Sequence, residues 1–257
     1  MTNDLSNIFT SILNDYADTC EEKRFNGNII IAKSMLEAYT SLRKDLVAQN
    51  KKALNEIEEY HGLTIQPSDP NDEFTILLNE KYIIDSCKKG NVDWIGTLVH
   101  EAVHINDFKN YFNIVQPESY DELFEYDKHR LFLYLTEFRA RAIGHYFLRK
   151  YTLNNFKDEI HLQHLLEVEL PFQIEYMIGK LSQPINIDSK IYVVSHFLGR
   201  LATWRYLYPH TFNDQVIQSL FNQNPWMKEL FYFLITNHTL EKAYPNFDKM
   251  EKILEDA

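Results

Sequence analysis

The chain is poor in cysteine, glycine and proline, and each shortage narrows the class of protein it can be. Its two cysteines, Cys20 and Cys87, cannot build a disulfide framework and show no paired metal-binding spacing. Seven glycines and eight prolines in 257 residues leave few sharp turns, which favours long helices over many short strands. No run approaches the roughly 18 consecutive apolar residues that a membrane-spanning helix needs, so no membrane association is expected.

Positive charge is also scarce. The chain has 26 Lys and Arg against 37 Asp and Glu, which gives a formal net charge of −11. Nucleic acid is therefore not an expected partner, because phosphate binding needs clustered basic side chains. The amino terminus, "MTNDLSNIFTSILNDYADT", is polar and acidic and does not resemble a secretory signal. We expect a cytoplasmic protein, and signal-independent export as an effector stays open.

What the sequence does contain is helical periodicity. Apolar residues recur with the period of an amphipathic helix over residues 4–24, 34–60 and 128–151, and residues 157–257 read as further helices separated by prolines. The segment "FTILLNE", residues 74–80, predicts a strand, residues 63–66 look extended, and "GNIIIAKS" fits either a strand or a helix start. The prediction is one α+β domain over residues 1–257, predominantly helical, with a small sheet before the central helix. Its parts are N-terminal helices at 1–60, the sheet and metal-binding helices at 61–151, and C-terminal helices at 152–257.

The stretch "GTLVHEAVHINDF", residues 96–108, carries the clearest chemistry. Positions four apart lie on one helix face, so His100 and His104 can bind one ion while Glu101 reaches a water beside it. About one chain in thirty of this composition would show the spacing by chance. The uncharged residues around the two histidines favour a metal site, because burying two imidazoles and a carboxylate without one is expensive.

The segment resembles the HEXXH helix of the zincin metallopeptidases. Asp107 and Asn110 stand where metzincins have Gly and His, so the resemblance is to gluzincins, in which a Glu on a following helix is the third ligand. Glu137 of "YLTEFRARAIGHY", with Ala140 three residues later, fits that place. The layout of residues 74–150 also resembles the anti-repressor metallopeptidases of phages and mobile elements.

This resemblance implies one Zn²⁺ per chain, held by His100, His104 and Glu137. It further implies a protein or peptide substrate and hydrolysis with Glu101 as general base for a metal-activated water. It also implies that an edge strand beside the helix pairs with the substrate, a role we assign to "FTILLN".

Several residues around this core have competing interpretations. His129 is a rival to Glu137 as third ligand, or a residue that orients a ligand, and Glu137 itself could instead form a surface ion pair with Arg141. Asp107, one turn beyond His104, is expected to accept a hydrogen bond from a histidine ligand. His196 is the favoured donor to the developing oxyanion, ahead of four other candidates, which are Tyr134, His145, Tyr146 and Arg200.

Two other functions compete with a peptidase. A ferritin-like di-iron oxidase would use Glu101 and His104 as one Glu-x-x-His motif, but it needs a second motif, and Asp158 with His161 is the nearest match. A non-catalytic binding protein with a zincin fold would have no need of Glu101 as a base. The sequence leaves the substrate, the cleavage specificity and the oligomeric state open.

Overall fold

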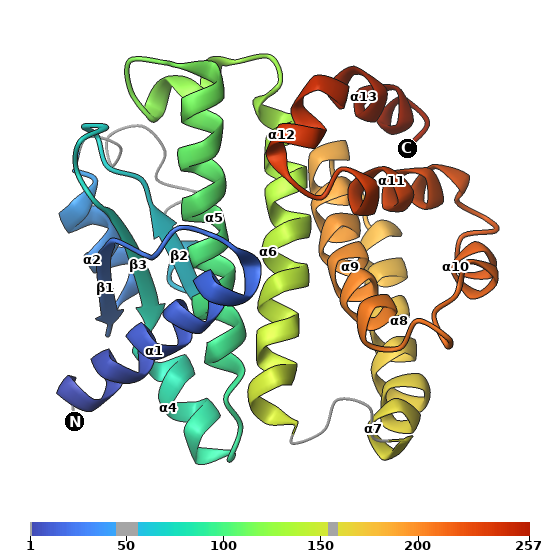
Figure 1. Cartoon of the computed structure of the whole chain (residues 1–257), viewed down its shortest axis with the longest axis horizontal. Helices are drawn as coiled ribbons and strands as arrows, with labels where there is room; N and C mark the ends of the chain where they lie inside the picture. Colours follow the sequence, from blue (N-terminus) through green and yellow to red (C-terminus); the bar gives the residue numbers. More distant parts are fainter. Residues whose placement is uncertain (1, 45–55, 154–158) are drawn as a thin grey trace. The chain divides into compact units, whose positions relative to one another are not determined.

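The computed structural model describes residues 2–44, 56–153 and 159–257. The chain divides into two compact units, Met1–Tyr126 and Asp127–Ala257 (Figure 1). Most described residues are helical, and a three-stranded sheet precedes the long helices, so the predicted α+β class is confirmed. The single domain over residues 1–257 stays a prediction. No helix within the described ranges is long and apolar enough to cross a membrane.

The first unit contains the three-stranded sheet together with helices that precede, interrupt and follow its strands in the sequence. Its elements are α1 (Thr2–Cys20), β1 (Gly27–Ala32), α2 (Met35–Leu42), β2 (Gly62–Ile65), β3 (Phe74–Asn79), α4 (Glu80–Lys88), α5 (Asp93–Val115) and the 3₁₀ helix η1 (Asp121–Glu125). The segment that fitted either a strand or a helix forms β1. The second predicted helix, residues 34–60, is described only in part: α2 ends at Leu42, and residues 45–55 lie outside the described residues.

The sheet has the order β1-β3-β2, with β1 parallel and β2 antiparallel to the central strand. Five consecutive residues of β3, from Phe74 to Leu78, are buried, as expected of a strand covered on both faces. Both edges of β3 are occupied by neighbouring strands. The prediction that "FTILLN" is a substrate-pairing edge strand is therefore wrong, because three strands of this order place the most apolar one in the middle. The edges belong to β1 and β2.

Helix α5 lies beside β2 (Figure 1) and is buried over most of its surface. Trp94 packs edge-to-face on Phe9 of α1, with the ring centroids 5.4 Å apart. Farther along, Leu98, Val99 and Val103 are fully buried. Burial on nearly all sides confirms the prediction drawn from the uncharged flanks, and it fixes the rotation of the helix that carries both histidines.

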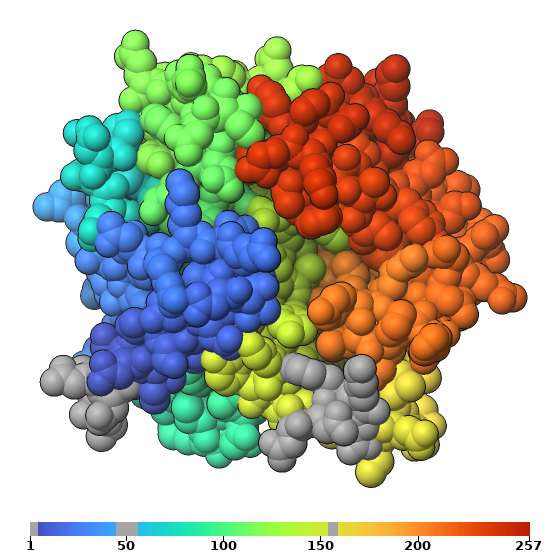
Figure 2. Space-filling model, in the orientation of Figure 1, coloured from blue at the N-terminus to red at the C-terminus, as the bar shows by residue number. Residues whose placement is uncertain are grey.

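The second unit is helical. Its elements are α6 (His129–Thr152), α7 (Glu159–His164), the π-helical turn η2 (Leu165–Glu169), α8 (Leu170–Leu181), α9 (Ile187–Leu207), α10 (Asp214–Leu220), α11 (Pro225–Thr236), α12 (Leu240–Ala243), η3 (Tyr244–Asn246) and α13 (Phe247–Glu255). Its C-terminal helices, orange to red, pack into one surface (Figure 2), beneath which Leu230, Phe231 and Phe247 are buried.

Helices α6 and α9 pack closely along their lengths. Gly199 makes this approach possible, because a Cβ atom there would lie 2.7 Å from the Phe138 carbonyl oxygen and 2.9 Å from Cβ of Arg141. The close packing brings the polar residues of the two helices, Glu137 and His196 among them, into hydrogen-bonding distance.

Candidate metal centre

His100 and His104 point their Nε2 atoms at each other. The two nitrogens are 3.0 Å apart and the rings are nearly perpendicular, at 86°. Two nitrogens at tetrahedral positions on a zinc ion, each about 2.0–2.1 Å from it, are about 3.3 Å apart. The spacing therefore fits two ligands of one ion, and the predicted convergence of the two rings is confirmed. His104 is buried, with 7% of its surface exposed, and His100 is half-buried.

Glu101 is buried beside this pair and is held from the sheet. The Oγ1 atom of Thr64, on β2, lies 2.9 Å from Oε2 of Glu101 and 3.0 Å from its backbone oxygen. Gly62 gives the side chain its space, since a Cβ atom there would lie 2.5 Å from Thr97 and 3.0 Å from Oε1 of Glu101. Strand β2 thus fixes the rotamer of Glu101, the residue that directly follows His100.

In the second unit, Glu137 accepts a hydrogen bond from His196. Nε2 of His196 lies 2.8 Å from Oε2 of Glu137, and Nη2 of Arg141 lies 3.0 Å from Nδ1 of the same ring. A guanidinium can only donate, so Nδ1 accepts and the ring proton sits on Nε2, which donates to Glu137. Burial, together with the charge of Arg141, lowers the pKa of His196 to about 4, so the ring is neutral at pH 7.

This arrangement bears on two interpretations drawn from the sequence. The side chain of Glu137 is 17% exposed, and Arg141 reaches His196 rather than pairing with Glu137 on a solvated face. The Nε2 proton of His196 is directed at Glu137, so this histidine orients the Glu137 carboxylate. That role is separate from the oxyanion-donor role predicted from the sequence. Its assignment as an oxyanion donor stays a prediction.

His100, His104 and Glu137 together make up a His–His–Glu group that could hold a metal ion, each residue offering one ligand atom. Within the described residues it is the one group of this kind, so a second cluster, which a di-iron centre would use, is not found there. Of the second motif proposed for a di-iron protein, Asp158 lies outside the described residues.

The remaining predicted residues are buried. Asp107, at 1% exposed, lies one turn beyond His104 on α5, and its role as a hydrogen-bond acceptor stays a prediction. His129 begins α6 and is 5% exposed, and burial lowers its pKa to about 4. A neutral imidazole is the form that binds metal, yet His129 is not in the group that could hold the ion.

The other candidate oxyanion donors have partners within the second unit. Tyr134 donates to Asp188, and burial first and then this bond raise its pKa. Nε2 of His145 accepts from Trp204 at 3.1 Å, and Arg200 donates to Gln173. Tyr146 packs edge-to-face on Phe147 and Tyr206.

Sequence reasoning missed Thr64 and Gly62. A threonine in a short strand and a glycine before it carry no signal of their own. They matter here because β2 lies against α5 at Thr97 and Glu101. No protein-family model, curated protein or solved structure matches the chain.

Proposed function

We propose that the chain is a zinc-dependent metallopeptidase of gluzincin type. The observation that carries the proposal is the pair of imidazole Nε2 atoms, 3.0 Å apart, next to a buried glutamate that a neighbouring strand holds in place. A structural zinc site needs no such base, whereas a hydrolase does.

His100, His104 and Glu137 are the proposed ligands of one Zn²⁺. Two imidazoles and a carboxylate are a ligand set of catalytic zinc, which keeps a further position open for water. When bound, the ion would supply Lewis-acid activation of that water and of the scissile carbonyl. His196 supports Glu137 by donating to Oε2, which leaves the other carboxylate oxygen for the metal.

Glu101 is the proposed general base. Its carboxylate takes a proton as the water attacks the peptide carbonyl and passes that proton to the departing amine. The hydroxyl of Thr64 orients the carboxylate for both transfers. The substrate is a protein or peptide, and an edge strand available to pair with it beside α5 is β2.

A peptide library incubated with the protein and analysed by mass spectrometry tests this function. The wild-type chain with one equivalent of zinc should cleave peptide bonds, the chelator-stripped chain should not, and zinc should restore cleavage. Glu101→Gln should bind zinc as tightly as wild type and cleave nothing. Cleavage that survives in Glu101→Gln, or that ignores zinc, would contradict the mechanism. Two irons per chain would favour the oxidase instead.

A further inference from the structure

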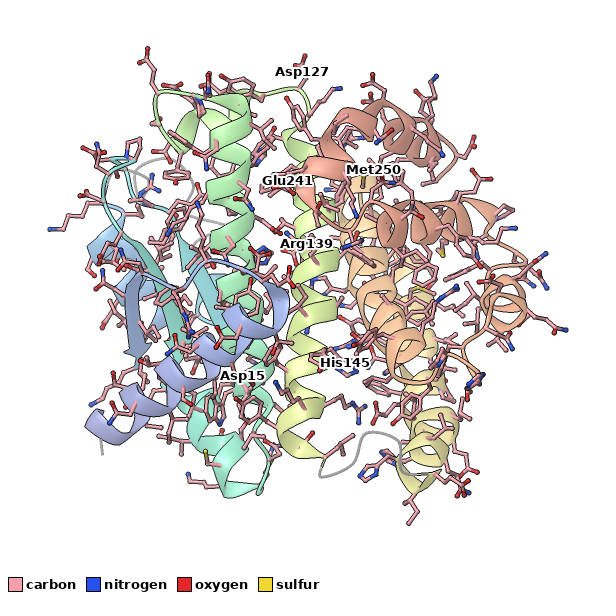
Figure 3. All side chains as sticks on the ribbon, in the orientation of Figure 1. Asp15, Asp127, Arg139, His145, Glu241 and Met250 are labelled. Atoms are coloured by element: carbon pink, nitrogen blue, oxygen red, sulfur yellow. The ribbon has the colours of Figure 1, made fainter. Side chains whose placement is uncertain are left out.

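Helices α6 and α9 face each other with a ladder of polar side chains spaced one turn apart. On α6 it comprises Glu137, Arg141, His145 and Arg149, and on α9 it comprises His196, Arg200 and Trp204. Residues four apart share a helix face, so each helix contributes a continuous row. The ladder lies within the second unit, and Figure 3 labels one of its α6 residues, His145.

The positive charges of this ladder outnumber the partners that could neutralise them. Arg149 has a carboxylate partner, Glu169. Arg141 and Arg200 instead donate to neutral groups, the His196 ring and the Gln173 amide. Among the described residues, neither guanidinium forms an ion pair with a carboxylate, although Glu169 acts electrostatically on Arg200. The buried Nε of Arg141 has no hydrogen-bond partner.

His145 adds no charge that changes this balance, because burial, and then the neighbouring arginines, lower its pKa well below its usual value. Burial first, and then Arg141, lower the pKa of Arg200 to about 10, so it stays charged at pH 7. A partly buried cation without an anion is costly, and a bound anion would remove that cost.

We propose that Arg141 and Arg200 bind a carboxylate group of the substrate. The inference rests on the proposed peptidase function, because Arg141 is linked to the proposed ligand Glu137 through one histidine ring. Guanidinium groups recognise carboxylates with paired, charge-assisted hydrogen bonds. In a peptide that carboxylate is either the free C-terminus or the side chain of Asp or Glu.

Two exposed aromatic residues adjoin the arginines. The Tyr192 ring lies 4.3 Å from the His196 ring, and Tyr176 acts electrostatically on Arg200. Tyr192 and Tyr176 are 45% and 51% exposed. They offer an apolar surface to the residue that carries the carboxylate.

The activity test compares two peptide libraries of the same sequences, one with free C-termini and one with C-terminal amides. The zinc-loaded chain should cleave near the free C-terminus, or else beside Asp and Glu in both libraries, and either pattern supports carboxylate recognition. Arg141→Met and Arg200→Met should each reduce this preference roughly 10- to 100-fold, the range for losing a hydrogen bond to a charged group. The matched control is Arg130→Met on the same helix, because Arg130 lies near a carboxylate, Asp188. Equal cleavage of both libraries without preference for acidic residues would overturn the proposal.

A binding measurement separates failure of this inference from failure of the peptidase function. The zinc-free chain of residues 1–257 is titrated with N-acetyl-phenylalanine and with its amide by calorimetry or NMR. The acid should bind at least roughly 10-fold more tightly than the amide, and Arg200→Met should abolish the difference. Met replaces the aliphatic stem of Arg and removes an unmatched charge, so this variant should keep or raise the melting temperature. Equal binding of acid and amide would overturn the proposal even if zinc-dependent cleavage is found. So would a preference for the acid that survives in both Arg141→Met and Arg200→Met.

Discussion

The histidine pair of α5 and the single histidine of α9 are all at least half-buried, but they use their ring nitrogens differently. His196 is bonded to protein groups at both nitrogens, Arg141 on one side and Glu137 on the other, which fixes its tautomer and neutral charge. His100 and His104 turn Nε2 atoms toward each other, an arrangement in which one shared cation satisfies both. The difference separates a histidine bonded to protein groups at both nitrogens from a pair whose nitrogens could share an ion.

Removing a histidine of the α5 pair should have the largest effect on metal binding. His100→Ala or His104→Ala should weaken zinc binding by more than roughly 100-fold and reduce cleavage to background, because the change removes a ligand and not its support. Zinc per chain, measured by atomic emission after dialysis, checks the first effect. His238→Ala, at an exposed position, is the control and should keep its zinc. Full zinc occupancy in both α5 variants would place the metal elsewhere.

The support role of the second region is tested at Glu137 and His196. Glu137→Gln should lower zinc affinity about 10- to 100-fold, and His196→Ala should lower it by a smaller factor, with partial recovery in His196→Asn. Competition with a chromophoric chelator measures both. Glu175→Gln on exposed α8 is the control. If His196→Ala loses cleavage but keeps its zinc affinity, the histidine acts as the predicted oxyanion donor and not as support for Glu137.

Thr64→Val should separate orientation of the base from binding of the metal. Valine has the shape of threonine without its hydroxyl, so Glu101 loses the hydrogen bond to Oε2. We expect kcat to fall about 10-fold, within the range for general-base catalysis, while zinc content and KM stay unchanged. Thr10→Val, which removes an exposed hydroxyl bonded to Ser6, serves as control. An unchanged kcat would show that Thr64 has no part in positioning the base.

The neutral buried histidines predict acid sensitivity of the fold. The pKa of His129 is about 4 in the folded chain, below its usual 6.5, so the unfolded chain binds more protons between these values. Stability is therefore highest above about pH 6.5 and falls as the pH drops toward 4, by at most about 3 kcal/mol for this residue. Urea unfolding of wild type and His129→Gln at pH 7 and pH 5 measures the effect. A pH dependence that is equal in the two chains would exclude His129 as a source.

Much of this site could be predicted from the sequence because it is local. The positions of His100, Glu101 and His104 follow from the period of one helix, whereas Glu137 is implied only by the resemblance to gluzincins. The hydrogen bonds that orient these residues join positions far apart, 37 residues for Thr64 to Glu101 and 59 for Glu137 to His196. Helical periodicity carries no information about such pairs, nor about which strand of a three-stranded sheet lies in its centre.

X-ray absorption at the zinc edge, on the chain of residues 1–257 loaded with one equivalent of zinc, shows whether His100 and His104 share one ion. We expect two imidazole ligands at about 2.0–2.1 Å, completed by oxygen and without sulfur. The spectrum of His104→Ala should lose one imidazole. A zinc ion bound by one imidazole or none, or by a cysteine sulfur, would contradict the assignment of His100 and His104 as the metal site.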